Sequence, residues 1–464
     1  MQAGEETKGR GSWASQLGFI LAAAGSAIGL GNIWRFPYMT GTMGGAIFVF
    51  IYICCVVFLA FPVMVAEITI GRTTKRNPVG AFKALSPGRP WLLVGSLGVV
   101  TGIAILSYYG VIAGWTLGYL LMTAFGKFQQ LAGPGETGRI FSSYVSSPVW
   151  SLVGLAAFLL MTMAVIVGGV QKGIERVNKI FMPLLFLLLI ILVVRAVTLP
   201  GCGKGLAFYL MPDFGEVTPR TVVAALGQAF FSLSLGMGAM ITYGSYLGKK
   251  SNVFACSGWI CLADTSVAFL AGLAIFPALF SFGLEPGQGP GLVFIVIPQV
   301  FGKMPFGQFF GAIFFILLIL AALTSTISLL EVVTAYIVDE WKWSRTRAAL
   351  ATTLLCFLLG TPSALSTGAV GRLGALYKAG GKDQGFLDLM DLVFGNLSLV
   401  IGALFIAVFT GWAWKRADLF REVTQSSSPA VRVLLWVWYV LVKILCPIGI
   451  LAILGNLIYS LVKT

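Results

Sequence analysis

The sequence of 464 residues contains no histidine, and Asp, Glu, Lys and Arg together make up only 10% of it. A soluble domain carries about a quarter charged residues, whereas 58% of this chain is hydrophobic. The composition therefore excludes a soluble globular protein and indicates a polytopic membrane protein. The lack of histidine excludes a histidine proton relay and a conventional zinc site. No nucleophile–base pair stands out either, so we do not expect an enzyme.

The seven cysteines form neither a C-x-x-C motif nor the framework of a disulfide-rich domain. Six of them lie in or beside apolar runs, and only Cys202 lies in a predicted outer loop. The first sixteen residues are polar and lead directly into an apolar run, so we expect no cleaved signal peptide.

The net charge of +14 could suggest a nucleic-acid partner, but the positions of the basic residues argue against one. Lys and Arg are concentrated in alternate connecting segments, for example at Arg72, Lys172, Lys249 and Lys415. This alternation is typical of the positive-inside rule. We therefore expect the plasma membrane as the location, the lipid bilayer as a partner and a cytoplasmic N-terminus.

Apolar windows of about 20 residues predict eleven membrane spans. They lie near 17–41, 43–70, 91–124, 148–169, 174–198, 221–246, 255–283, 307–338, 346–361, 386–413 and 431–461. An odd number of spans places the C-terminus outside. The expected divisions are a cytoplasmic segment 1–16, a first repeat 17–198, an extracellular loop 199–220, a second repeat 221–413, a cytoplasmic loop 414–430, and a last helix with its tail 431–464. Segments 127–147 and 199–220 are expected to form outer vestibule structure, and 362–385 a Gly-rich outer loop.

Clustered glycines interrupt two of these apolar runs, at 25–32 (GSAIGLGN) and 232–238 (SLSLGMG). Backbone at membrane depth must satisfy its own polar groups, so paired breaks indicate a transporter's binding site. When the number of residues that separates the two breaks is added to the position of Tyr109 in the third span, the result is residue 316 in the eighth span. The third span then corresponds to the eighth, as a five-plus-five repeat requires. Small residues for close helix packing are the alternative. The charge of Arg35, inside the same apolar run, favours a functional break.

Polar residues in the other spans are few. Thr324 and Ser325 belong to a hydroxyl cluster that either bonds back to its own helix or, opposite freed carbonyls of the first span, ligates Na⁺. Apart from acidic residues that begin spans, three lie inside them, and each is a functional hypothesis by default. Glu67 could cap the broken sixth helix, Asp264 has no basic neighbour in sequence, and Glu331 either lines an inner exit path or anchors a helix contact.

Three blocks carry a family resemblance: WASQLG at 13–18, AGSAIGLGNIWRFP at 24–37 and FFSLSLGMGAMITYGSYL at 230–247. They resemble the neurotransmitter:sodium symporter family, especially bacterial members that carry hydrophobic amino acids and tryptophan, and the resemblance covers essentially the whole chain. It implies the leucine-transporter fold, which is an all-α integral membrane structure. In that fold a 5+5 inverted repeat is followed by one further helix, and helices 1 and 6 are broken. It also implies Na⁺-coupled amino-acid uptake by alternating access.

The resemblance also implies two Na⁺ sites and a substrate pocket. The first Na⁺ site would comprise Ala27, Asn32, Ser232 and the substrate carboxylate, and the second Gly25, Ile28, Ala321, Thr324 and Ser325. The pocket would comprise Ala27, Leu30, Gly31, Ile105, Tyr109, Phe231, Ser232, Ser234, Met237, Ser325 and Leu329. Tyr109 would bond the substrate carboxylate, and Phe231 would close over it as a lid.

Further positions match the family's gates and its chloride site. Asp388 and Asp391 begin the tenth span from the outside, and either could pair with Arg35. Arg35 with Asp391 resembles the outer gate pair, and Arg10 with Asp339 the inner pair. Tyr52, Gln228 and Ser232 match residues that hold chloride in chloride-dependent members, but here Asp264 lies beside them. A fixed carboxylate can replace the anion, so we expect no chloride requirement, and protonation of Asp264 on the empty return step gives proton counter-transport as a hypothesis. Gly173 and Pro183 have the spacing of a family feature that lets helix 5 unwind; the alternative is an ordinary helix start and a tolerated membrane proline.

The family's amine transporters carry an aspartate where this chain has Gly29, so the resemblance favours an α-amino acid that brings its own carboxylate. Met237 between two glycines makes an adaptable pocket wall, which favours a large hydrophobic or aromatic side chain, tryptophan first. The alternatives are a symporter for aliphatic amino acids, or a receptor or channel on the same fold. A channel needs a continuous polar pore, and the spans show isolated polar sites instead. The sequence leaves the oligomeric state open, and a monomer suffices for this function.

Overall fold

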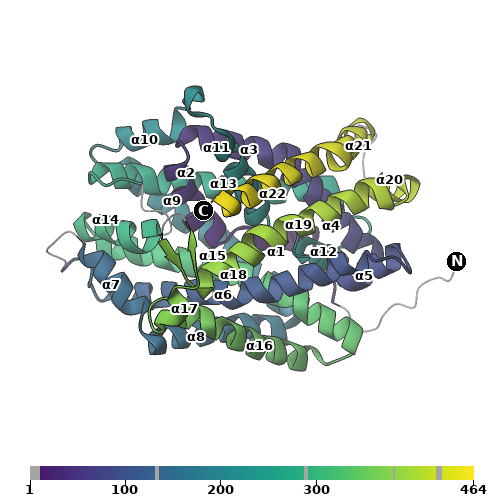
Figure 1. Cartoon of the computed structure of the whole chain (residues 1–464), viewed down its shortest axis with the longest axis horizontal. Helices are drawn as coiled ribbons and strands as arrows, with labels where there is room; N and C mark the ends of the chain where they lie inside the picture. The colour runs from purple at the N-terminus through teal and green to yellow at the C-terminus, as the bar shows by residue number, and fades with distance from the viewer. Residues whose placement is uncertain (1–10, 131–134, 287–290, 380–381, 425–430, 464) are drawn as a thin grey trace.

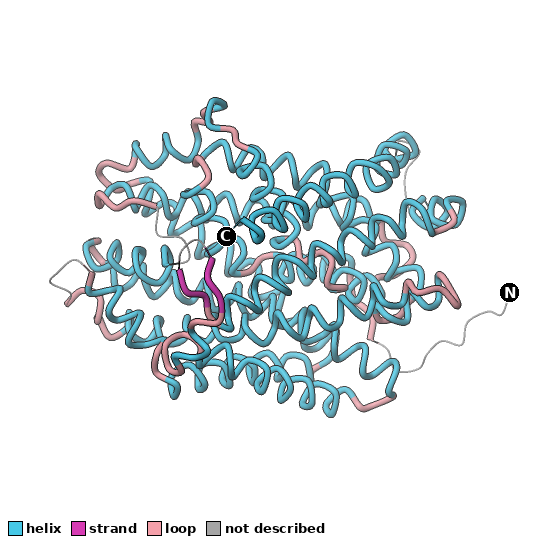
Figure 2. Tube along the Cα trace, in the orientation of Figure 1, coloured by secondary structure: helices cyan, strands magenta, loops and turns pink. Residues whose placement is uncertain are grey.

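The computed structural model describes residues 11–130, 135–286, 291–379, 382–424 and 431–463. These residues are almost entirely helical (Figure 2). The helices are α1 (Gln16–Ala27), α2 (Phe36–Thr42), α3 (Ala46–Cys55), α4 (Phe61–Thr74), α5 (Pro78–Leu85), α6 (Leu92–Ala124), α7 (Glu136–Val145), α8 (Pro148–Val167), α9 (Arg176–Val197), α10 (Gly203–Leu210), α11 (Pro219–Ser232), α12 (Ala239–Ser245), α13 (Val253–Ser281), α14 (Ile297–Lys303), α15 (Gly307–Trp341), α16 (Arg345–Leu365), α17 (Gly371–Gly374), α18 (Phe386–Met390), α19 (Leu399–Val408), α20 (Arg416–Thr424), α21 (Val431–Val440) and α22 (Cys446–Lys463).

Several of these helices continue into one another through π-helical turns. The π-helical turns span Gly31–Arg35, Val56–Ala60, Val170–Glu175, Leu292–Val296, Asp391–Ser398, Phe409–Ala413 and Leu441–Leu445, and Phe214–Glu216 forms a short 3₁₀ turn. The one strand pair among the described residues is an antiparallel hairpin of β1 (Tyr377–Ala379) and β2 (Lys382–Gln384). Tyr377 pairs with Gln384 in its register.

Within the described residues, nine helices are long and apolar enough to cross a membrane. A tenth candidate is the bent pair Gln16–Ala27 and Gly31–Thr42, whose halves meet at 48°. The predicted sixth span consists of α11, with 14 residues, and α12, with 7. Each is shorter than the roughly 20 residues that cross a bilayer. The protein is therefore a multi-pass membrane protein with both predicted helix breaks in place, and the total of eleven spans stays a prediction.

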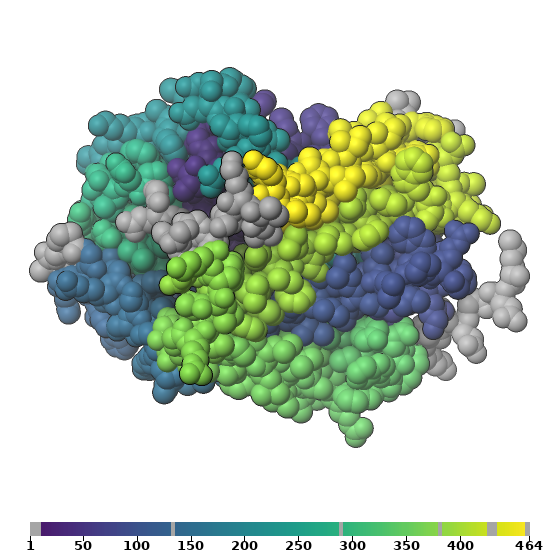
Figure 3. All heavy atoms as spheres, in the orientation of Figure 1, coloured from purple at the N-terminus to yellow at the C-terminus, as the bar shows by residue number. Residues whose placement is uncertain are grey.

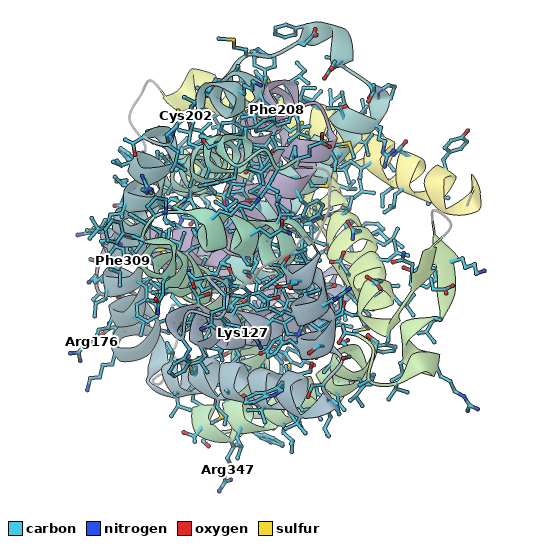
Figure 4. All side chains as sticks on the ribbon, turned by 90° about the vertical axis from the view of Figure 1, so that its left-hand side faces the viewer. Lys127, Arg176, Cys202, Phe208, Phe309 and Arg347 are labelled. Carbon is cyan, nitrogen blue, oxygen red and sulfur yellow. The ribbon has the colours of Figure 1, made fainter. Side chains whose placement is uncertain are left out.

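The bundle is elongated, and its two ends differ (Figure 1). The α7 end carries α7, α10, α14 and the hairpin, and the α5 end carries α5, α20 and α21. At the centre lies α15, and 89% of its most apolar window is buried, whereas only 28% is buried for the span that contains α9. The yellow C-terminal helices lie across the upper right part of the face seen in Figure 3. In the view onto the α7 end, Arg176 and Arg347 project from the edge of the bundle (Figure 4).

Several connecting segments contain short helices that the sequence patterns did not predict. The segments 127–147 and 199–220 contain α7 and α10, the loop at 362–385 contains the hairpin, and the predicted cytoplasmic loop contains α20. Arg72 anchors α20, because its Nε lies 2.9 Å from Glu422 Oε1 and its Nη1 donates to the Ser251 carbonyl over 2.7 Å. Arg72 is fully buried at the end of α4.

Candidate substrate and sodium site

The break in the first span frees backbone groups that would be bonded inside an intact helix. α1 ends at Ala27, and Ile28 is extended, with ψ of 108°. The Gly29 N–H donates to the Asn32 amide oxygen over 3.0 Å, and the Leu30 N–H donates to the Tyr109 hydroxyl over 2.9 Å. These two bonds cap the second half of the span, which leaves carbonyls at the end of α1 as acceptors.

The break in the sixth span is held open by left-handed backbone. Ser234, Gly236 and Gly238 have φ of 54°, 86° and 77°, values that end a right-handed helix and that glycine adopts readily. The Gly236 N–H donates to Glu67 Oε1 on α4 over 2.7 Å. Glu67 therefore caps the broken helix, which is one of the roles that the sequence analysis left open. The Ser234 hydroxyl donates to the Ser26 carbonyl over 2.8 Å and so joins the two breaks.

Four of the five residues predicted for the second Na⁺ site converge. The Ile28 carbonyl accepts from the hydroxyls of Thr324 and Ser325, each over 3.3 Å, and the Thr324 hydroxyl also lies 2.9 Å from the Ala321 carbonyl. Gly25, the fifth residue, lies one turn back on α1. Carbonyl and hydroxyl oxygens are the ligands of hard cations, so this cluster fits Na⁺. The described residues hold no group of three or more His, Cys, Asp or Glu that would suit another metal.

Asn32 and Ser232, two of the three residues predicted for the first Na⁺ site, form a buried polar cluster with Tyr52 and Asp264. Tyr52 donates to Asp264 Oδ2 over 3.0 Å, and Asn32 Nδ2 donates to Asp264 Oδ1 over 2.8 Å. The Ser232 hydroxyl lies 2.9 Å from Asp264 Oδ1. Gln228 instead donates to the Gly31 carbonyl over 2.8 Å, so it is a neighbour of the cluster rather than a partner of Asp264. The Asn32 oxygen accepts one bond and keeps a second lone pair for a cation.

A small cavity of about 30 Å³ lies between the two breaks. Ten of the eleven residues predicted for the pocket line it; its full lining is Ser26, Ala27, Gly29, Gly31, Ile105, Tyr109, Phe231, Ser232, Ser234, Met237, Ser325, Leu329 and Leu399. Leu30, the eleventh predicted residue, is buried and does not belong to this lining; its N–H donates to the Tyr109 hydroxyl. Leu399 was missed, because nothing in the sequence sets it apart from the other apolar residues of its span.

A second, much larger cavity of about 990 Å³ lies on the α7 side of the first. Phe231 and Tyr109 line both cavities. The Arg35 guanidinium lies over the Phe231 ring, with Cζ 4.3 Å from the ring centroid. Arg35 does not pair directly with Asp391: its Nη2 donates to Asn396 Oδ1 over 2.8 Å, and Asn396 Nδ2 donates to Asp391 Oδ2 over 3.1 Å. At the predicted outer gate, Arg35 and Asp391 are thus joined through Asn396, a residue that nothing in the sequence singled out.

The α5 side of the small cavity is closed by packed aromatic and charged residues. The Trp13 indole N–H donates to the Tyr243 carbonyl over 2.9 Å. Tyr246 donates to Glu331 Oε1 over 2.7 Å, and Arg345 forms an ion pair with both oxygens of Glu331. Glu331 is fully buried in these contacts, so it anchors a helix contact in this conformation.

The predicted inner gate is described only in part. Arg10 lies outside the described residues. Asp339 accepts from the backbone N–H and the side-chain amide of Asn77, over 3.0 and 3.1 Å.

Helix 5 of the family fold is the span Val170–Val197, which comprises the π-helical turn before α9 and α9 itself and is distinct from α5. The two residues singled out for its unwinding lie in helical backbone here. Gly173 belongs to the π-helical turn Val170–Glu175, and Pro183 lies inside α9. Proline has no N–H, so Pro183 leaves the Lys179 carbonyl without its usual helical donor. The segment between Gly173 and Pro183 is thus intact in this conformation but lacks a full set of helical hydrogen bonds.

Comparison with known proteins identifies the family of this chain. The sequence profile described as "Sodium:neurotransmitter symporter family" matches residues 10–130 and 144–464. The chain belongs to this family. It is a sodium-dependent symporter, a transporter rather than an enzyme, and the resemblance noted in the sequence is confirmed.

Relatives of the family match the chain along its whole length. An uncharacterized sodium-dependent transporter, YhdH of Bacillus subtilis, is 41% identical over 96% of this chain and 97% of its own length. A sodium-dependent transporter of Haemophilus influenzae is 35% identical over 96% of this chain and 98% of its own. A crystal structure of MhsT in complex with L-phenylalanine superposes with a TM-score of 0.88, at 44% identity, over 97% of this chain and 100% of that one. The symporter therefore has the predicted leucine-transporter fold.

Proposed function

We propose that this symporter imports hydrophobic and aromatic L-amino acids, including tryptophan, together with Na⁺. One observation carries the proposal: among the described residues that line the small cavity there is no Asp or Glu. The substrate must then supply the carboxylate that completes the cation site, as an α-amino acid does. MhsT, the structural match, was crystallised with L-phenylalanine.

The helix ends around the cavity suit a zwitterion. α1 and α11 end at the cavity, and C-terminal helix ends carry partial negative charge that attracts an ammonium group. The second half of the first span begins there, and helix N-termini attract a carboxylate. Tyr109 stands beside this N-terminus and would donate its hydroxyl hydrogen to the same carboxylate. The amino and carboxylate groups of one amino acid would thus face opposite ends of the broken helices.

Two Na⁺ ions would couple to this substrate. The first would bind the Ala27 carbonyl, Asn32, Ser232 and the substrate carboxylate, so the affinities for ion and substrate rise together. The second would bind the cluster around the Ile28 carbonyl and hold α1 against α15. Both sites rest on oxygen ligands that the two breaks and α15 supply.

The side chain of the substrate would face Met237 and Leu399. The cavity of about 30 Å³ is far smaller than an aromatic amino acid, so its walls must move when one binds. Methionine has three rotatable bonds and adapts to irregular shapes, and the flanking Gly236 and Gly238 leave the backbone around it free to shift. An adaptable wall of this kind favours large side chains of differing shape.

Asp264 would make transport independent of chloride. Its carboxylate already receives hydrogen bonds from Tyr52 and Asn32, two of the residues around the first Na⁺ site, and so supplies the negative charge that chloride brings elsewhere. When the carrier returns without Na⁺, a proton would neutralise this buried carboxylate. Proton counter-transport would follow.

The remaining parts would form an alternating-access cycle in the plasma membrane. Arg35, Asn396 and Asp391 would close the outer side, and the Glu331 cluster, with Arg10 and Asp339, the inner side. Unwinding between Gly173 and Pro183 would admit water to the second Na⁺ site. We place the N-terminus inside and the C-terminus outside, and a single chain contains every residue that this cycle uses.

A binding screen of the twenty amino acids in Na⁺ and in K⁺ tests the proposal. We expect tryptophan and other large hydrophobic amino acids to bind in Na⁺ only. Preference for small aliphatic amino acids would exclude the aromatic assignment and leave the symporter. Binding that does not depend on Na⁺, or no binding of any amino acid, would contradict the main proposal.

A further inference from the structure

The side of helix 5 that meets α1 carries two oxygen-bearing side chains one turn apart, Glu175 and Asn178. Glu175 accepts from the Ala14 N–H over 2.7 Å and from the Ser15 hydroxyl over 3.3 Å, at the start of α1. It also pairs with Lys179 over 2.7 Å, and the Lys179 side chain is 42% exposed. Glu175 therefore lies at the solvent end of the contact between helix 5 and α1, whereas Arg176 projects away from the bundle (Figure 4).

Asn178 is fully buried, and its amide oxygen has no hydrogen-bond partner among the described residues. Its Nδ2 donates to the Ile174 carbonyl over 2.9 Å, which fixes the orientation of the amide. The oxygen therefore points at Gly25 of α1, where an added Cβ would overlap it. Most buried polar atoms are hydrogen-bonded, so an amide oxygen held in this way requires an explanation.

The position of this oxygen along α1 is informative. Glu175 contacts the helix at Gly18, Asn178 contacts it at Gly25, and the carbonyl of Ile28 belongs to the cluster that fits the second Na⁺ site. Asn178 thus lies between the solvent end of the contact and the cation cluster. It also lies at the C-terminal end of α1, where the helix dipole favours a cation.

The backbone that carries Asn178 is suited to opening. It lies between the π-helical turn Val170–Glu175 and Pro183, which leaves the Lys179 carbonyl without its helical donor. In the present conformation α1 covers the side chain completely. Separation of residues 14–18 from Glu175 would uncover Asn178 from the α5 end.

We propose that Asn178 is a further Na⁺ ligand, which binds the ion in transit from the second Na⁺ site to the cytoplasm. The inference rests on the proposed function and deepens it. A Na⁺ ion that leaves the Ile28–Thr324 cluster loses oxygen ligands in an apolar bundle, and the Asn178 oxygen replaces one of them. Glu175 is the next oxygen ligand along α1 once the start of this helix has moved away.

Three variants in proteoliposomes test the role. Asn178→Leu removes the oxygen at nearly constant volume, Asn178→Asp keeps an oxygen and adds charge, and Met182→Leu changes the other helix 5 side chain next to Gly25 without removing an oxygen. For Asn178→Leu we expect the release of ²²Na⁺ to the inner side to slow at least fivefold, with the Na⁺ dependence of substrate binding unchanged within twofold. For Asn178→Asp we expect inhibition of uptake by internal Na⁺ at concentrations at least fivefold lower. Met182→Leu should behave as the wild type.

The outcomes separate this proposal from the one on which it rests. Wild-type uptake that does not depend on Na⁺ refutes the symport assignment itself. Na⁺-coupled wild-type uptake, with Na⁺ release and internal inhibition in both Asn178 variants equal to those of Met182→Leu, refutes only the transit ligand. If Asn178→Leu fails to fold, internal inhibition of Asn178→Asp decides alone, and an unchanged value overturns the proposal.

Discussion

The guanidinium of Arg35 lies over the ring of Phe231, and this ring is the partition between the two cavities of the transporter. The Arg35 Cζ is 4.3 Å from the ring centroid. Such cation–π contacts contribute about 0.5–2 kcal/mol, depending on their exposure to water. The contact therefore positions the Phe231 ring but is weak enough for the ring to move, as the proposed role of Phe231 as a lid requires.

Removal of the partition should weaken substrate binding from the outer side. In Phe231→Ala the two cavities become continuous, and we expect the dissociation constant of the bound amino acid to rise at least tenfold, or about 1.4 kcal/mol. Equilibrium binding of a radiolabelled amino acid measures this change. Phe231→Tyr keeps a ring beneath Arg35 and serves as the control; equal affinity of the Ala variant and the wild type would contradict the role.

Loss of Asn396 should loosen the outer gate without touching the substrate pocket. Asn396 joins Arg35 to Asp391, so in Asn396→Ala we expect the bound amino acid to dissociate to the outside three- to tenfold faster. Stopped-flow chase of bound substrate gives this rate. Asn396→Asp, which can pair with Arg35 directly, should restore slow dissociation, and a wild-type rate in the Ala variant would show that the bridge has no role.

Replacement of Asp264 should create a chloride requirement. In Asp264→Asn the negative charge beside Tyr52 and Asn32 is lost, so we expect uptake in chloride-free medium to fall at least tenfold and to recover with chloride. Na⁺-driven uptake in gluconate and chloride media measures it. Two results would contradict this prediction: stimulation of wild-type uptake by chloride, or equal uptake by the Asp264→Asn variant with and without chloride.

A side chain at Gly29 should abolish substrate binding while the protein still folds. A Cβ there would lie 2.8 Å from the Tyr109 hydroxyl and would overlap the Ser325 hydroxyl. We expect Gly29→Ala to lower affinity at least 100-fold. Gly227→Ala is the matched control, because a Cβ at that helical position meets no atom within 4 Å. Similar affinities for the two variants would contradict the close approach at Gly29.

The ion pair between Arg345 and Glu331 should contribute strongly to the stability of the closed inner side. Removal of one partner leaves a buried charge, and such changes cost about 3–5 kcal/mol. We expect Arg345→Gln to lower the melting temperature in detergent markedly. The double variant Glu331→Gln/Arg345→Gln has no buried charge and should recover much of the loss; a double variant as unstable as the single one would argue against this cause.

Sequence patterns predicted a candidate site because backbone irregularity inside an apolar span is visible in the sequence. Glycine clusters are visible in a sequence, and the breaks at 25–32 and 232–238 lie where they were predicted. The hydroxyls of Thr324 and Ser325 also face the freed Ile28 carbonyl as expected. Each of these signals is local, and each is unusual inside an apolar span.

Residues that reach the site only through the packing of the helices have no such signal in the sequence. Leu399 is one apolar residue among many in its span, and it reaches the cavity only through the path of the tenth span. Asn396 enters the outer gate because it lies in the π-helical turn Asp391–Ser398, and the sequence did not predict that turn. Leu30 was predicted for the pocket but does not belong to the cavity lining, and a π-helical turn begins directly after it.

The bond between Glu67 and Gly236 has a mechanical consequence. It ties the sixth-span break to α4, and Gly71 of α4 packs directly against the backbone of Ile241 in α12. We therefore expect α4 and α12 to move as one rigid unit that also carries Met237. Thr324 and Ser325 belong to a different element, α15. In the proposed cycle the amino acid would contact Met237 on this unit, and the second Na⁺ would contact Thr324 and Ser325 on α15. Amino acid and ion together would then couple the unit to α15, and a carrier that holds only one of them would leave the two parts uncoupled.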